Sequence, residues 1–128
     1  MVYLDASALV KLVNEEPESG ALRRYHRGHP DQVASALGRV EVIRAARRRG
    51  ASLVDRALAV LDETDLLDVD ESILRSAAMI GDPTLRSLDA IHLASAQALA
   101  EDVEALVTYD DRLARAAAEL GFAVASPA

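Results

Sequence analysis

The pattern that decides the fold lies at the start of the chain, in the stretch VYLDASALVKLV, residues 2–13. Its first three residues, 2–4, form a short apolar run that is typical of a buried strand. Asp5 ends this run, and apolar residues then recur at helical spacing over residues 8–13. The pattern predicts a strand that passes directly into a helix, with a carboxylate at the junction.

The alternation of strands and helices continues along the rest of the chain. Further strands are expected at residues 32–34, 66–69, 105–108 and 122–124, and further helices at residues 18–27, 37–49, 52–61, 72–80, 88–100 and 111–120. No tight turn of the kind that closes a β-hairpin joins two of these strands. We therefore expect an α/β fold in which a parallel β-sheet is sandwiched between α-helices.

The helix expected at residues 37–49 has a strong amphipathic pattern. Residues that recur at helical spacing would share one side of it. The apolar members of that side are Leu37, Val40, Ile43 and Ala46. We expect these four residues to form the buried face of the helix.

Length and composition fit one compact domain spanning residues 1–128. Of the 128 residues, 51% are hydrophobic and 27% are charged, so a packed core is available. The absence of cysteine excludes disulfides, a thiol nucleophile, zinc ribbons and iron–sulfur sites. The longest uncharged stretch, residues 90–100, is shorter than the ~18 residues needed to span a bilayer, and the N-terminus lacks the basic flank of a signal peptide. We expect a soluble, cytoplasmic protein with no membrane association.

The distribution of charge leaves room for a nucleic-acid partner despite a net charge of −7. Residues 20–50 carry eight arginines but only two acidic residues, Asp31 and Glu41. Arginine also outnumbers lysine thirteen to one, and guanidinium groups suit bidentate contacts with phosphate. Two interpretations stay open, a basic face that binds phosphate and a bias of codon composition.

Acidic residues follow two of the expected strands. Asp5 follows the strand at residues 2–4, and both Asp110 and Asp111 follow the strand at residues 105–108. In open parallel sheets, active sites lie beyond the carboxyl ends of the strands, so these acids are candidate site residues. The alternative is structural, because each acid also precedes a helix and aspartate is a common N-cap.

Two further acids, Glu41 and Asp89, stand beside apolar residues. Glu41 lies close to the apolar face of the helix at residues 37–49, and Asp89 opens an otherwise uncharged segment. A carboxylate at the edge of a core is unfavourable unless it is paired or bound to a metal ion. The structural alternatives are an ion pair of Glu41 with Arg44 or Arg48, and an N-cap role for Asp89.

If these four acids converge, their cluster requires a cation. Two carboxylates ~5 Å apart repel each other by roughly 3 kcal/mol at an effective dielectric constant of about 20. Ligation by oxygen alone suits hard divalent ions such as Mg²⁺ or Mn²⁺ rather than zinc. Sites of this kind typically serve phosphoryl chemistry, in which the ion activates water and neutralises charge on the transition state.

Four segments share the order and spacing of one known family. They are YLDASAL (residues 3–9), SALGRVEV (35–42), LDAIHLASA (88–96) and VTYDDRL (107–113). Together they resemble the PIN-domain nucleases, and most closely the toxin ribonucleases of bacterial and archaeal VapBC toxin–antitoxin modules. The resemblance covers essentially the whole chain, and its specificity comes from the four segments occurring in order.

The resemblance implies an endoribonuclease site built from four acids. Asp5, Glu41, Asp89 and Asp110 match the acidic quartet of the family, which holds Mg²⁺ or Mn²⁺ and activates water to cut RNA. Asp5 and Asp89 match direct metal ligands, whereas Glu41 and Asp110 match acids that act through water or a second ion. The family spacing of a threonine, any residue and an aspartate favours Asp110 over the adjacent Asp111.

The resemblance also implies supporting residues and partners. Ser7 and Thr108 match the small hydroxyl residues that orient the acids. The family fold is a parallel sheet between helices, and it usually forms a homodimer. An antitoxin inhibits the family by inserting its C-terminal segment into the acidic groove. We therefore expect an RNA substrate, a cognate antitoxin and a homodimer.

Some alternatives stay open at this level. His92 follows Asp89 by three residues on the same helix face, so it could be a metal ligand, a histidine bonded within the core or a dimer contact. The chain could also be a catalytically inactive PIN-like binding module, although its intact quartet argues against this. A PIN nuclease outside any toxin–antitoxin system is the other alternative.

Overall fold

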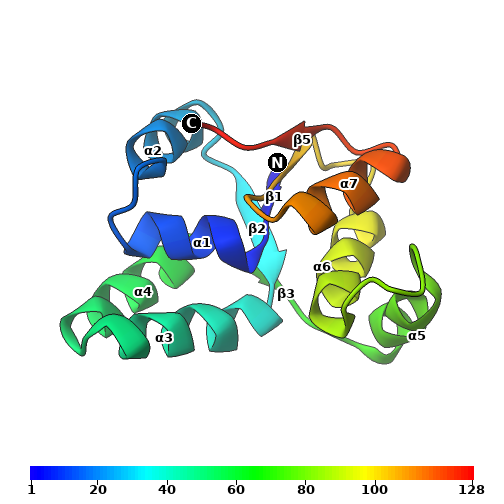
Figure 1. Ribbon diagram of the computed structural model, residues 1–128, viewed down its shortest axis with the longest axis horizontal. Coiled ribbons are helices and arrows are strands. Elements are labelled where there is room, and N and C mark those ends of the chain that lie inside the picture. Colours follow the sequence, from blue (N-terminus) through cyan, green and yellow to red (C-terminus); the bar gives the residue numbers. More distant parts are fainter.

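A parallel five-stranded sheet forms the centre of the computed structural model, which describes residues 1–128 (Figure 1). Its strands are β1 (Val2–Leu4), β2 (Gln32–Ser35), β3 (Asp65–Leu67), β4 (Ala105–Val107) and β5 (Val124–Ala125). They lie in the order β3-β2-β1-β4-β5, and each neighbouring pair is parallel. The predicted α/β class is confirmed.

Seven helices cover the two faces of this sheet (Figure 1). They are α1 (Ala6–Val13), α2 (Ser19–Gly28), α3 (Leu37–Arg49), α4 (Ser52–Asp62), α5 (Glu71–Met79), α6 (Ser87–Ala98) and α7 (Asp111–Glu119). Helices α1 to α4 lie on one side, and α6 and α7 lie on the other, with α5 packed against α6. None of the helices is long and apolar enough to cross a membrane.

The strands divide the core between these two layers by the alternation of their side chains. Val2 and Leu4 of β1 belong to the cluster under α1 to α4, whereas Tyr3 belongs to the cluster under α6 and α7. On β4, Val107 and Leu106 divide in the same way. Both faces of the sheet are therefore buried, which explains why β1 and β4 are continuous apolar runs in the sequence.

The buried face of α3 matches the predicted one only in part, because Ala46 is buried and Ile43 packs against the core, but Val40 does not. Gly38, Val42 and Ala46 are buried, whereas Val40 is 55% exposed. The cause is the close approach of α3 to α1, because a Cβ atom at Gly38 would lie only 3.1 Å from the Cδ1 atom of Leu9. Gly38, the smallest residue of α3, therefore lies in the contact between the two helices. As a result, α3 is rotated about its axis, and its larger apolar residues do not all face the core.

Two strand positions also differ from the prediction. β3 begins at Asp65 because its backbone pairs with Val33 of β2, and it ends at Leu67. β5 consists of only two residues, which pair with Leu106 and Val107 of β4. In both cases the register of the neighbouring strand sets the bounds, whereas the sequence pattern only locates the apolar residues.

Candidate active site

The carboxyl ends of β1 and β4 bring the first and last candidate acids to the same edge of the sheet. Leu4 pairs with Val107 in the parallel register, and the backbone N–H of Asp5 donates to the carbonyl of Val107 at 3.2 Å. Asp110 follows β4 by three residues. Strand ends that are more than 100 residues apart in the sequence therefore meet at this edge, which is where open α/β sheets hold their active sites.

Asp5 is almost completely enclosed by hydrogen-bond donors, with only 4% of its surface exposed. Its Oδ1 atom accepts from the hydroxyl of Ser7 at 2.6 Å and from the backbone N–H of Ala8 at 3.0 Å. Its Oδ2 atom accepts from the hydroxyl of Thr108 at 2.6 Å. The expected contacts of Ser7 and Thr108 are therefore present. The capping role is present too, since Asp5 is also the N-cap of α1.

Burial raises the pKa of Asp5, and the hydrogen bonds from Ser7, Thr108 and Ala8 only partly oppose this effect. The charged carboxylate therefore lies in an environment that disfavours its charge. A cation bound beside it would reverse that preference.

Asp89 lies in the first turn of α6 and is half-buried. Arg86 occupies the N-cap position of α6, and no side chain caps this helix. Asp89 is therefore not an N-cap, so the structural role considered for it from the sequence is wrong. Burial raises the pKa of Asp89, and the negative charges of Asp110 and Asp5 raise it further. Asp110 and Asp5 therefore lie close enough to Asp89 for their charges to act on it.

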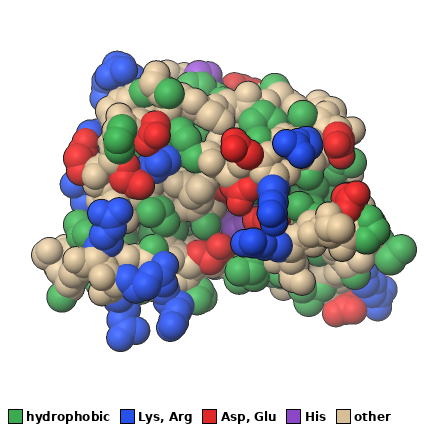
Figure 2. Space-filling view, in the orientation of Figure 1, with side chains coloured by type: hydrophobic (Ala, Val, Ile, Leu, Met, Phe, Trp, Pro, Cys, Tyr) green, Lys and Arg blue, Asp and Glu red, His purple; other side chains and the backbone are tan.

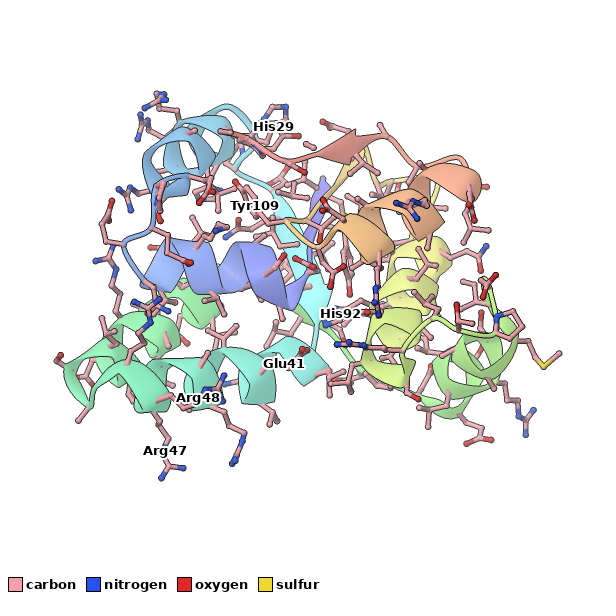
Figure 3. All side chains as sticks on the ribbon, in the orientation of Figure 1. His29, Glu41, Arg47, Arg48, His92 and Tyr109 are labelled. Atoms are coloured by element: carbon pink, nitrogen blue, oxygen red, sulfur yellow. The ribbon has the colours of Figure 1, made fainter.

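Glu41 projects from α3 toward α6, as Figure 3 shows. Its Oε1 atom lies 2.7 Å from Nε2 of His92, and its side chain is 23% exposed. The expected alternative, an ion pair with Arg44 or Arg48, is not formed. A histidine from another helix, which no local pattern of the sequence indicates, is therefore the partner of this acid.

Asp110 and Asp111 have different surroundings. Asp110 is half-buried, and its Oδ1 atom accepts from the backbone N–H groups of Arg112 at 2.9 Å and Leu113 at 3.2 Å. These bonds make it the N-cap of α7. Asp111 is exposed in the first turn of the helix. Asp110 is the less exposed of the two residues and its charge raises the pKa of Asp89, so the structure favours Asp110 as the residue near the other acids.

Acidic side chains gather in a central hollow of the face shown in Figure 2. No three His, Asp or Glu side chains are arranged so that they could hold one ion together. The acids therefore form an open group rather than a closed cage. Mg²⁺ usually keeps several waters and binds through one or two carboxylates, so the oxygen-only donor set of this group fits such an ion.

A cleft of about 730 Å³ lies along α3, and Glu41 is the one candidate acid that lines it. Its polar lining consists of Ser7, Lys11, Glu16, Glu41, Arg44 and Arg48, together with Tyr109. Lys11, the single lysine of the chain, is bonded to Glu18 at 2.9 Å and lies 4.8 Å from the ring centre of Tyr109. The cleft is therefore lined by both acidic and basic side chains, of which Glu41, Arg44 and Arg48 lie on α3.

The fold and this acidic edge together define the class of protein. The family model of the PIN domain matches residues 2–119, and the chain is accordingly a PIN-domain protein.

Relatives define the group more narrowly. The chain is 50% identical over 126 residues to Ribonuclease VapC46 of Mycobacterium tuberculosis strain H37Rv, covering 98% of this chain and 97% of the relative. It is 44% identical over 132 residues to Ribonuclease VapC47 of Mycobacterium tuberculosis strain CDC 1551, covering 99% and 97%. The chain belongs to the VapC ribonucleases, the RNA-cleaving hydrolases of the PIN-domain family.

Solved structures share the fold at lower sequence identity. VapC20 of Mycobacterium tuberculosis, a toxin that cleaves the sarcin–ricin loop, superposes with a TM-score of 0.78 at 17% identity, covering 99% of this chain and all of that one. A chain from a toxin–antitoxin complex of Klebsiella pneumoniae superposes with a TM-score of 0.75 at 20% identity, covering 100% and 98%. These likenesses confirm that the chain has the architecture of VapC structures.

Proposed function

We propose that this chain is a metal-dependent endoribonuclease that acts in the cytoplasm as the toxin of a toxin–antitoxin pair. Its proposed catalytic residues are Asp5, Glu41, Asp89 and Asp110. The observation that carries the proposal is the buried Asp5, which three donors hold at an edge of the sheet where the charges of Asp110 and Asp5 raise the pKa of Asp89. Its relatives of 44–50% identity are named ribonucleases, which supports RNA as the substrate.

The proposed cofactor is Mg²⁺ or Mn²⁺. Asp5 and Asp89 are the candidates for direct ligands, because burial and neighbouring charges disfavour their ionised forms in the absence of a cation. Glu41 and Asp110 would act through water or a second ion. When bound, such an ion lowers the pKa of a bound water and neutralises charge on the phosphate that is attacked.

The residues of the chain have distinct roles in this proposal. Ser7 and Thr108 fix both oxygens of Asp5, so this carboxylate cannot rotate away from the site. Asp110 uses one oxygen to cap α7 and keeps the other for the site. Because these hydrogen bonds already hold the carboxylates in place, their side chains need to move less when a metal ion binds.

The arginines of α3 are the proposed contacts to RNA phosphates. Arg44, Arg47 and Arg48 surround one shallow depression, are exposed and form no ion pair. Figure 3 shows Arg47 and Arg48 on α3, with Arg47 extending away from the body of the protein. In Figure 2, basic side chains gather over this part of the molecule, beside the acidic hollow.

Replacing Arg47 and Arg48 with glutamine is expected to weaken RNA binding. Each phosphate contact that is lost should reduce the slope of log affinity against log salt concentration by about 0.7 for single-stranded RNA. Fluorescence anisotropy of a labelled, uncleavable RNA at several salt concentrations measures this slope. The control is the pair Arg24→Gln and Arg27→Gln on α2, which removes the same charge elsewhere. A slope equal to that of the wild type would show that Arg47 and Arg48 are solvent-exposed residues that do not contact RNA.

An antitoxin partner and a homodimer belong to the same proposal. A toxin–antitoxin complex contains a chain of this fold, and the acidic hollow would accept a basic side chain of a partner. Two symmetric copies would present two such hollows to a two-fold symmetric antitoxin.

Expression of this chain alone is expected to stop bacterial growth, and co-expression of the neighbouring small gene is expected to restore it. Growth curves measure both effects, and gel filtration should show a complex larger than either protein. An Asp5→Asn variant is the control, because it should bind the partner without arresting growth. If the neighbouring product neither binds nor suppresses cleavage, the chain is a nuclease outside a toxin–antitoxin pair. A wild type that cuts no RNA would favour an inactive binding module.

A further inference from the structure

Three side chains from three different elements form a hydrogen-bonded chain beneath the acidic hollow. The hydroxyl of Tyr3 on β1 lies 2.9 Å from Nδ1 of His92 on α6, and Nε2 of His92 lies 2.7 Å from Oε1 of Glu41 on α3. Tyr3 is fully buried, and His92 is 2% exposed. The chain of bonds runs from the core to the edge of the cleft, and Figure 3 shows His92 and Glu41 at its outer end.

The direction of the hydrogen bonds follows from the chemistry of the three groups. An ionised carboxylate only accepts, so Nε2 of His92 must carry the proton and donate it to Glu41. In a neutral imidazole Nδ1 then accepts from the hydroxyl of Tyr3, whereas in a doubly protonated ring Nδ1 donates to it; Nε2 donates to Glu41 in both forms. Burial raises the pKa of Tyr3, so this phenol keeps its proton.

This arrangement decides between the interpretations that were open for His92. Both ring nitrogens are engaged, Nδ1 with the hydroxyl of Tyr3 and Nε2 with Glu41. No ring lone pair is left for a metal ion, so a metal-binding pair of His92 and Asp89 is not formed here. The ring of Tyr3 also packs edge-on against the imidazole, with 6.1 Å between ring centres.

Glu41 has no other side-chain partner. The carboxylate of Glu41 forms no further hydrogen bond or ion pair. Arg44 and Arg48 line the same cleft, and an ion pair with either of them would draw the carboxylate away from the aspartates. A glutamate has three rotatable side-chain bonds, so a free carboxylate samples many orientations, and fixing it in one of them costs conformational entropy. The bond to His92 is the feature that selects one orientation.

We propose that His92 is a positioning residue of the nuclease, which orients the carboxylate of Glu41 through Nε2 while Tyr3 fixes its ring through Nδ1. This inference rests on the proposed function, because it assigns His92 a role through an acid of the proposed site. Residues that orient acids near metal ions in this way typically contribute about 10- to 100-fold to activity or metal affinity.

Two substitutions separate positioning from simple packing. In His92→Gln, the amide nitrogen reaches about as far as Nε2 and can still donate to Glu41. In His92→Asn, the amide ends near the position of Nδ1 and can contact Tyr3 only. We expect His92→Asn to lower kcat about 10- to 100-fold, with little change in KM, and His92→Gln to recover most of the lost activity. Thermal unfolding of both variants, without metal ions, measures the effect on packing alone.

A double-mutant cycle tests whether His92 acts through Glu41. If it does, His92→Asn should have little further effect on kcat in a Glu41→Gln protein, since the group that it orients is already altered. Mn²⁺ affinity, measured by electron paramagnetic resonance, should show the same coupling. Independent effects of the two substitutions would overturn the proposal.

The protonation of the ring provides a measurement that does not depend on activity. The chain has three histidines, and ¹⁵N NMR of the imidazoles should find His92 with its proton on Nε2. A proton on Nδ1 alone, with Nε2 unprotonated, would overturn the proposal, as would equal kcat for the wild type and His92→Asn. Equal losses in His92→Gln and His92→Asn that follow their loss of thermal stability would also overturn it. A wild type that cuts no RNA would instead overturn the proposed function.

Discussion

The substitution Asp5→Asn is expected to lower RNA cleavage by on the order of 10²–10³-fold while the protein stays folded. The side chain keeps its shape but loses the negative charge that a cation would neutralise. It also keeps one oxygen, which can still accept from Ser7 and Ala8 at the start of α1. Because burial disfavours the charged form of Asp5, the neutral asparagine removes an unfavourable contribution to folding, so the loss of activity should come from chemistry rather than from unfolding.

The measurements are kcat on a labelled RNA, growth of cells that express the variant, and the melting temperature. Asp111→Asn is the matched control, because it removes the same charge from an exposed carboxylate on α7. Asp110→Asn should have the larger effect of the two. A toxic and active Asp5→Asn protein would contradict the assignment of this acid, and a stronger effect at Asp111 would show that it is the acid of the site.

The fold and most of the site could be predicted because their signals are local. The apolar run before Asp5 and the spacing after it identify a strand, a helix and their junction. The same pattern places Asp110 after β4. In a parallel sheet, such junctions meet at one edge, so two acids of the candidate site follow from chain order alone.

The parts that could not be predicted depend on contacts between distant segments. The bond between Glu41 and His92 joins residues that are 51 positions apart, and neither residue shows its partner through local spacing.

The rotation of α3 has a similar cause. Gly38 takes the contact with Leu9 because it lets two helices approach closely, whereas hydrophobic periodicity favours the larger Val40. This rotation decides where Glu41 points.

Removal of divalent ions is expected to abolish RNA cleavage completely, and Mg²⁺ or Mn²⁺ should restore it. The physical reason is the charge of the acidic group. Burial raises the pKa of Asp5, and the charges of Asp110 and Asp5 add to the effect of burial on Asp89, which the nearby Arg86 only partly opposes. Negatively charged RNA would be repelled from such a site unless a cation lay between the carboxylates and the phosphate.

The same ions should stabilise the folded protein, because they bind the native state and not the unfolded chain. At an ion concentration of about 100 times Kd, the gain is about 2.7 kcal/mol, which corresponds to a rise in melting temperature of roughly 10 °C for a domain of this size. Scanning calorimetry with and without Mn²⁺ measures this rise. It should disappear in Asp5→Asn and persist in Asp111→Asn, which ties the bound ion to the buried carboxylate. Cleavage that continued unchanged in excess EDTA would refute metal dependence, even if the melting temperature responded to the ion.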